Sequence, residues 1–184
     1  NKIFVYSFAQ FINVFISFLL SPYLSRALEK EEYAIYNQAL YLGSFITILF
    51  SLGLFNVVNY FFVKKDNYDE QNTIQSLILF LGTITTLIFY FSGFLFNNST
   101  LAEIIKIYAL SFIFAFPANF FNAILIINNK TKYVAYCSII VTLLNSGGLF
   151  ISIQEFHSII FAFYILGIIV PILNFVLLFV KAKN

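Results

Sequence analysis

The sequence predicts an all-α integral membrane protein, a single bundle of six transmembrane helices. Of its 184 residues, 61% are hydrophobic and only 10% are charged, whereas soluble domains carry about 25% charged residues. The charged residues occur in short clusters, which leave six uncharged stretches at 3–25, 33–63, 71–102, 107–129, 133–154 and 156–180. The shortest stretch holds 22 residues, and a helix that crosses a bilayer needs roughly 20 apolar residues.

Two other membrane architectures fit the pattern poorly. A barrel would show strands of about ten residues with alternating apolar side chains, but segments such as 45–55 are apolar on nearly every face. A cleaved signal peptide would end at small residues, whereas the first stretch runs directly into a charged turn. We therefore expect one six-helix lobe over residues 1–184, with spans at about 3–25, 35–62, 74–97, 104–128, 133–153 and 157–180.

The loop charges predict the orientation of the bundle. When the loops are assigned alternately to two sides, the side of the N-terminus carries seven lysines against three acidic residues, Asp66, Asp69 and Glu70. The opposite side carries Arg26, Lys30 and Lys106 against five glutamates. Because cytoplasmic loops are enriched in Lys and Arg, both termini are expected in the cytoplasm.

The turn after the first span is the densest charged segment on the outer side. It contains the only arginine, Arg26, followed by Glu29, Glu31 and Glu32. We interpret it as a structural turn in which the glutamates pair with Arg26; direct contact with a substrate is the alternative. The external-turn residues of interest are Arg26, Glu29 and Glu32.

Uncharged polar residues form stripes along the predicted spans, because a helix advances about 100° per residue. Ser and Thr in such stripes can simply join helices through hydrogen bonds of about 0.6 kcal/mol. Amides are harder to bury without partners, so we predict that seven of them line a hydrated cavity suited to a sugar: Gln10, Asn13, Asn37, Asn59, Asn119, Asn122 and Asn145.

The cytoplasmic lysines and the scarcity of reactive residues complete the site prediction. Lys64, Lys65, Lys130 and Lys132 could bind phosphate at the inner mouth, although their role in orienting the chain and their attraction to anionic lipid explain them better. With one histidine and one cysteine, Cys137, the chain shows no catalytic motif or metal-ligand cluster. We therefore expect no enzymatic activity, no metal, no cofactor and no nucleic-acid partner.

Two segments carry a family resemblance. One combines the Leu-Ser-Arg-x-Leu turn of Leu24 to Leu28 with Glu32, Tyr33 and Tyr36, and the other is the proline-bearing stretch 114–133. Together they resemble the N-terminal lobe of Wzx-type flippases for O-antigen or capsule repeat units, in the MOP exporter superfamily. Two departures from the pattern are Glu29 and Ala34, which stand where glycine is usual.

The resemblance implies a bacterial inner-membrane transporter of two lobes, like MATE exporters, working by alternating access. Its substrate would be an undecaprenyl-pyrophosphate-linked oligosaccharide, and its partners membrane lipids, a second six-helix lobe absent from this chain and polysaccharide polymerase machinery.

Three alternatives stay open. A MATE-like exporter of small molecules would call for an acidic residue inside a span, which this chain lacks. Part of a membrane polysaccharide polymerase would need large outer loops, whereas the segments 97–103 and 153–158 are short. A structural membrane subunit without transport activity is the third.

Overall fold

The computed structural model describes residues 2–51 and 68–183, and the regular structure in these ranges is helical. In chain order the elements are α1 (Lys2–Ala27), α2 (Lys30–Ser51), α4 (Tyr68–Ser92), the 3₁₀ turn η1 (Gly93–Leu95), α5 (Ser99–Ile127), α6 (Thr131–Gln154), α7 (Ile159–Tyr164), the π-helical segment η2 (Ile165–Ile169) and α8 (Val170–Lys183).

Among the described residues, five stretches are long and apolar enough to cross a bilayer: Phe4–Ala27, Thr73–Leu95, Ser99–Ile127, Thr131–Gln154 and Ile159–Ala182. The predicted class, an all-α multi-pass membrane protein, is confirmed. The predicted second span, 35–62, begins in α2 and continues outside the described residues, so the count of six stays a prediction.

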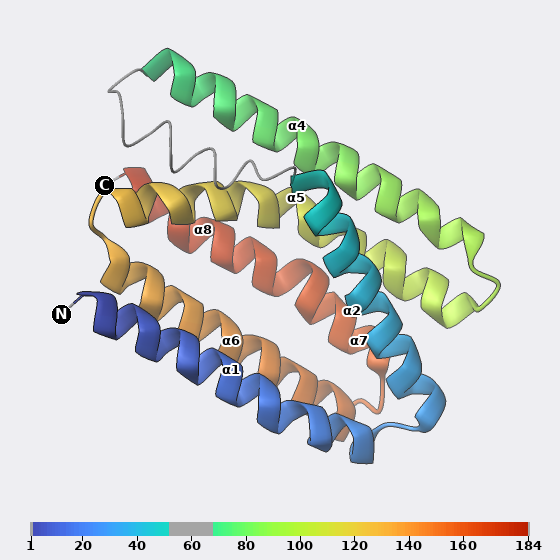
Figure 1. Cartoon of the computed structure of the whole chain (residues 1–184). Coiled ribbons are helices and arrows are strands. Elements are labelled where there is room, and N and C mark those ends of the chain that lie inside the picture. The colour runs from blue at the N-terminus through green and yellow to red at the C-terminus, as the bar shows by residue number, and fades with distance from the viewer. Residues whose placement is uncertain (1, 52–67, 184) are drawn as a thin grey trace.

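The helices form a curved row in which each packs on the next (Figure 1). Helix α4 packs on α5, α5 on α8, α8 on α6 and α6 on α1, while α2 crosses in front of α5. Helices α1, α4 and α6 start at the same end of the bundle, and α5 and α8 return to it (Figure 1). The start of α1 and the end of α8 therefore share one end. That this end is cytoplasmic remains a prediction.

Aromatic side chains of α5 form the centre of the core. The buried ring of Phe112 lies 5.3 Å from that of Phe89 in α4 and 5.7 Å from that of Tyr108. Tyr108 in turn contacts Phe163 of α7, which lies 5.8 Å from Tyr36 of α2. These rings connect four helices through packing, which drives helix association in lipid because the hydrophobic effect is absent there.

Proline positions explain the irregular parts of the helices only in part. The π-helical segment η2 ends just before Pro171, whose missing N–H leaves a helix carbonyl without its usual donor. Pro117 lies buried inside α5, which stays α-helical throughout. Pro22 lies inside α1, which continues through it to Ala27, because neighbouring groups can satisfy the freed backbone in a membrane helix.

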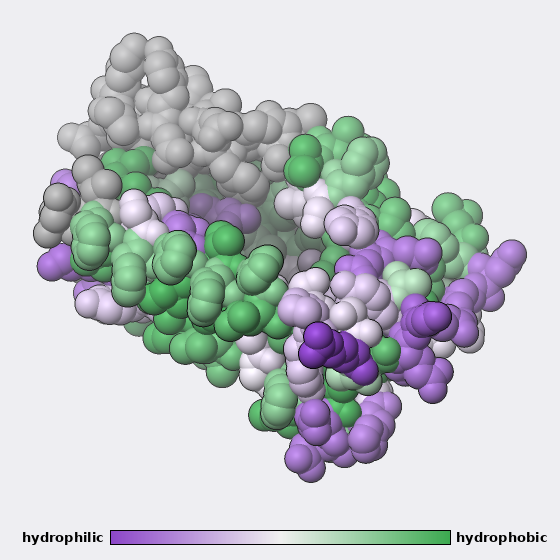
Figure 2. Space-filling view, turned by 60° about the horizontal axis from the view of Figure 1, so that its bottom comes forward, coloured by the Kyte–Doolittle hydropathy of each residue, from purple (hydrophilic) through white to green (hydrophobic). Residues whose placement is uncertain are grey.

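The outer surface of the bundle is apolar. Along α1 the exposed rings of Phe4, Phe8, Phe11, Phe15 and Phe18 face outward. Figure 2 shows this broad apolar face, with hydrophilic residues gathered towards the ends of the molecule. An apolar band between polar ends is the surface that a bilayer requires.

Candidate substrate cavity

A polar cavity lies between α1, α5, α6 and α8, near the end of the bundle where the chain starts. It has a volume of about 140 Å³, and we call it the amide cavity. Its lining comprises Tyr6, Gln10, Asn119, Asn122, Val134, Cys137, Ser138, Val141, Thr142, Asn174 and Leu178. Three of the amides predicted from the sequence, on two different helices, therefore meet at one site.

Asn122 in the lining of this cavity, and two amides outside the lining, offer hydrogen-bond acceptors that the protein leaves free. Asn13 donates through Nδ2 to the hydroxyl of Ser138, which joins α1 to α6. In the described part of the chain, the side-chain oxygens of Asn13, Asn122 and Asn145 are buried and accept no hydrogen bond. A buried acceptor without a donor costs about 1–3 kcal/mol. A ligand or water that brings hydroxyl donors would remove this cost.

A second hollow, the tyrosine pocket, lies between α1 and α2 nearer the opposite end. It has a volume of about 270 Å³ and is lined by Ser17, Leu20, Ser21, Leu24, Tyr33, Tyr36, Asn37 and Leu40. The hydroxyls of Ser21 and Tyr33 lie 3.4 Å apart, and Asn37 donates to the carbonyl of Tyr33 at 2.8 Å. The hydrogen bonds from Ser21 and Asn37 lower the pKa of Tyr33.

One face of α1 connects the two hollows. Gln10 lines the amide cavity and Ser21 the tyrosine pocket. Eleven residues separate them on a helix that rises about 1.5 Å per residue, so they lie about 16 Å apart along the axis. Between them, Asn13 contacts α6 through Ser138. The polar stripe predicted for the first span therefore borders the amide cavity with one part and the tyrosine pocket with another.

The remaining predicted amides do not line the amide cavity in the described structure. Asn37 lines the tyrosine pocket and not the amide cavity. Asn145 lies two turns beyond Ser138 on α6 and belongs to neither lining. Asn59 lies outside the described residues. Neither Tyr6 nor Asn174 was predicted from the sequence, although Tyr6 lies one helical turn before Gln10 and shares its face.

The four lysines predicted to bind phosphate also differ in their surroundings. Lys130 donates from Nζ to the carbonyl of Lys181 at 3.2 Å, and nearby Tyr133 donates to the carbonyl of Leu177 at 2.9 Å. Lys130 thus binds one of the last carbonyls of α8, where cations are favoured. Lys132 is exposed on the same turn. Lys64 and Lys65 lie outside the described residues.

The turn between α1 and α2, which we predicted to be external, is held by backbone capping, without the ion pair we expected. Glu32 Oε2 accepts a hydrogen bond from the backbone N–H of Glu29 at 3.4 Å, which is half of a capping box at the start of α2. Among the described residues, no salt bridge joins Arg26 to these glutamates. Glu31 and Glu32 instead lie in the first turn of α2, where their negative charge interacts favourably with the positive end of the helix dipole.

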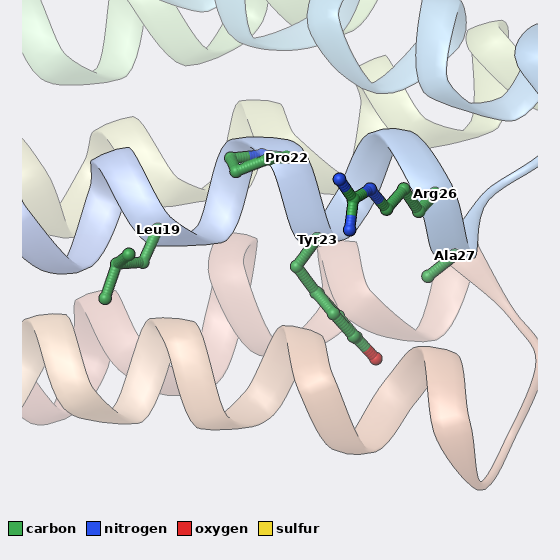
Figure 3. Close-up of a pocket in the computed structure, with 5 residues that line it drawn as sticks. All are labelled: Leu19, Pro22, Tyr23, Arg26 and Ala27. Carbon is green, nitrogen blue, oxygen red and sulfur yellow. The ribbon is translucent and has the colours of Figure 1, made fainter.

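Arg26 borders an open surface groove with Leu19, Pro22, Tyr23 and Ala27. Figure 3 shows its side chain lying back along α1, while the Tyr23 ring points towards α6. There Tyr23 stacks on Phe150 at 5.2 Å and accepts a hydrogen bond from Gln154 at 3.0 Å. These contacts hold the C-terminal end of α1 against α6.

A comparison with known protein families identifies the family of this chain. The chain matches the family described as polysaccharide biosynthesis protein over residues 1–183. It belongs to this family. Comparisons with curated proteins and with solved structures gave no match. Because the match covers nearly the whole chain, it supports a role in polysaccharide biosynthesis. A cavity lined by amides and hydroxyls agrees with this role.

Proposed function

We propose that this chain is one lobe of a flippase that moves an undecaprenyl-pyrophosphate-linked oligosaccharide across the bacterial inner membrane. The amide cavity is the observation that carries the proposal. It is lined by the amides of Gln10 on α1 and of Asn119 and Asn122 on α5, and the buried oxygen of Asn122 accepts no hydrogen bond. A glycan offers many hydroxyl donors and no fixed charge. Membership of the polysaccharide biosynthesis family supports the same substrate class.

The chemistry of transport follows from hydration. A glycan crossing hydrocarbon would lose the hydrogen bonds of its hydroxyls, each worth several kcal/mol in an apolar medium. Asn13, Asn122 and their neighbours can accept those bonds within the bundle. The lipid tail stays in the bilayer along the apolar outer face. No step of this process breaks a covalent bond, so we propose a transporter and not an enzyme.

The transporter is completed by parts outside the described structure. A second six-helix lobe would close the amide cavity, and the two lobes would rock about it to give alternating access. Lys64, Lys65 and Lys132 would hold the pyrophosphate at the cytoplasmic mouth as point charges. Lys130, at the start of α6, is instead bonded to the end of α8. Polysaccharide polymerase machinery would receive the glycan outside.

Deleting the gene in its host and locating the lipid-linked glycan tests this function. The proposal predicts that single repeat units accumulate on the cytoplasmic leaflet. Repeat units that are exported but unpolymerised would overturn it in favour of a polymerase. Normal glycan together with loss of resistance to small toxic cations would overturn it in favour of a small-molecule exporter.

A further inference from the structure

We infer that the tyrosine pocket is a second saccharide site, which takes one sugar ring of the glycan after it leaves the amide cavity. The inference rests on the proposed function and adds a stage to it. The pocket is separate from the amide cavity and shares no lining residue with it. The two are joined along the polar face of α1.

The lining of the tyrosine pocket matches the two faces of a sugar ring. Ser17, Ser21, Tyr33 and Asn37 supply hydroxyl and amide groups, while three leucines supply an apolar surface. A pyranose presents hydroxyls around its rim and C–H groups on its faces, so it can use both kinds of surface. No residue of this lining carries a charge, which favours a neutral ligand.

The size of the pocket favours a single ring over a whole oligosaccharide. Its volume of about 270 Å³ lies just below the roughly 300 Å³ at which sites for drug-sized molecules begin. The wall formed by Tyr36 is fixed, because that side chain is buried and its ring packs 5.8 Å from Phe163. A fixed aromatic wall avoids the loss of side-chain entropy on binding.

The polar groups of the tyrosine pocket can exchange their present hydrogen bonds for hydrogen bonds to a ligand. The contact between Ser21 and Tyr33, at 3.4 Å, is longer than the usual range for hydroxyl pairs. Little is therefore lost when a sugar hydroxyl inserts between them. Asn37 uses its Nδ2 for the Tyr33 carbonyl, which fixes the amide so that its oxygen can accept from the ring.

The absence of tryptophan from the chain allows a direct test with single-tryptophan reporters. Leu20→Trp reports on the tyrosine pocket, and Tyr6→Trp on the amide cavity. Tyr41→Trp is the control, because Tyr41 is 73% exposed on α2 and lines neither hollow. The purified full-length variants in detergent are titrated with the neutral oligosaccharide released by mild acid from the host's lipid-linked glycan.

The inference predicts a saturable change in emission from Leu20→Trp and none from Tyr41→Trp. Adding Asn37→Leu should weaken binding at this reporter about tenfold, whereas Gln38→Leu, on the exposed side of α2, should leave it unchanged. A response from Tyr6→Trp alone would overturn the second site and leave the proposed function standing. Silence at both reporters would overturn both, and an equal response from Tyr41→Trp would show binding without a site.

Discussion

Gly167 lies in a close helix contact, whereas Gly147 faces open space. Gly167 lies in the π-helical segment, where an added Cβ would come within 2.9 Å of the backbone oxygen of Ile107. Only glycine allows α5 and the last span to approach this closely. Around Gly147, in contrast, an added Cβ would meet nothing within 4 Å.

Substituting these two glycines by alanine should therefore have opposite effects on stability. Gly167→Ala should destabilise the fold by about 1–3 kcal/mol because backbone must move. Gly147→Ala should be neutral or stabilise by up to about 1 kcal/mol, because alanine favours the helix. Unfolding in mixed micelles with increasing SDS measures both, and equal effects would contradict the close contact.

Asn98 determines where α5 begins. Its side-chain oxygen accepts a hydrogen bond from the backbone N–H of Leu101 at 3.0 Å, and replacing such a cap costs about 1 kcal/mol. Asn98→Ala should lose this amount in the same unfolding measurement. Its neighbour Asn97, exposed and without the capping position, is the matched control; an equal loss in Asn97→Ala would exclude the cap as the cause.

At the scale of elements, charge gaps predicted the helices well and their ends less well. Within the described residues, the uncharged stretches are mostly helical, because a long apolar segment in lipid must satisfy its own backbone. Their ends depend on caps such as Asn98 and on the tolerance of α1 for Pro22. The π-helical segment before Pro171 was not predicted; within it, Gly167 packs closely against the backbone of α5.

The end of α8 is held on α6 by a side chain that sequence reasoning did not single out. Tyr133 donates to the carbonyl of Leu177 at 2.9 Å, one residue before Leu178 of the amide cavity. Tyr133→Phe should cost about 0.6 kcal/mol, the average for such bonds between membrane helices. Tyr136→Phe, at an exposed position on α6, should cost nothing. Equal unfolding midpoints for the two variants would show that the bond adds no stability.

For the whole molecule, the sequence indicated which residues of the spans are polar, but not which of them line the amide cavity and which line the tyrosine pocket. Helical periodicity placed Gln10 and Asn13 on one face of the first span and Asn119 and Asn122 on another helix, and the structure brings the two faces together. Periodicity within one helix carries no information on which helices are neighbours. The separation of Asn37 into a second pocket depends on how α1 and α2 diverge, so it required the three-dimensional arrangement.

In the proposed flippase, the amide cavity carries the glycan across the membrane. The most direct measurement is the fraction of lipid-linked glycan that a membrane-impermeant oxidant reaches in spheroplasts. The deletion strain is complemented with wild type, with Asn122→Leu or with the control Gln38→Leu, at equal levels in the membrane. Losing one buried amide should slow the appearance of glycan outside about tenfold, while Gln38→Leu should match wild type. Unchanged transport in Asn122→Leu would contradict the claim.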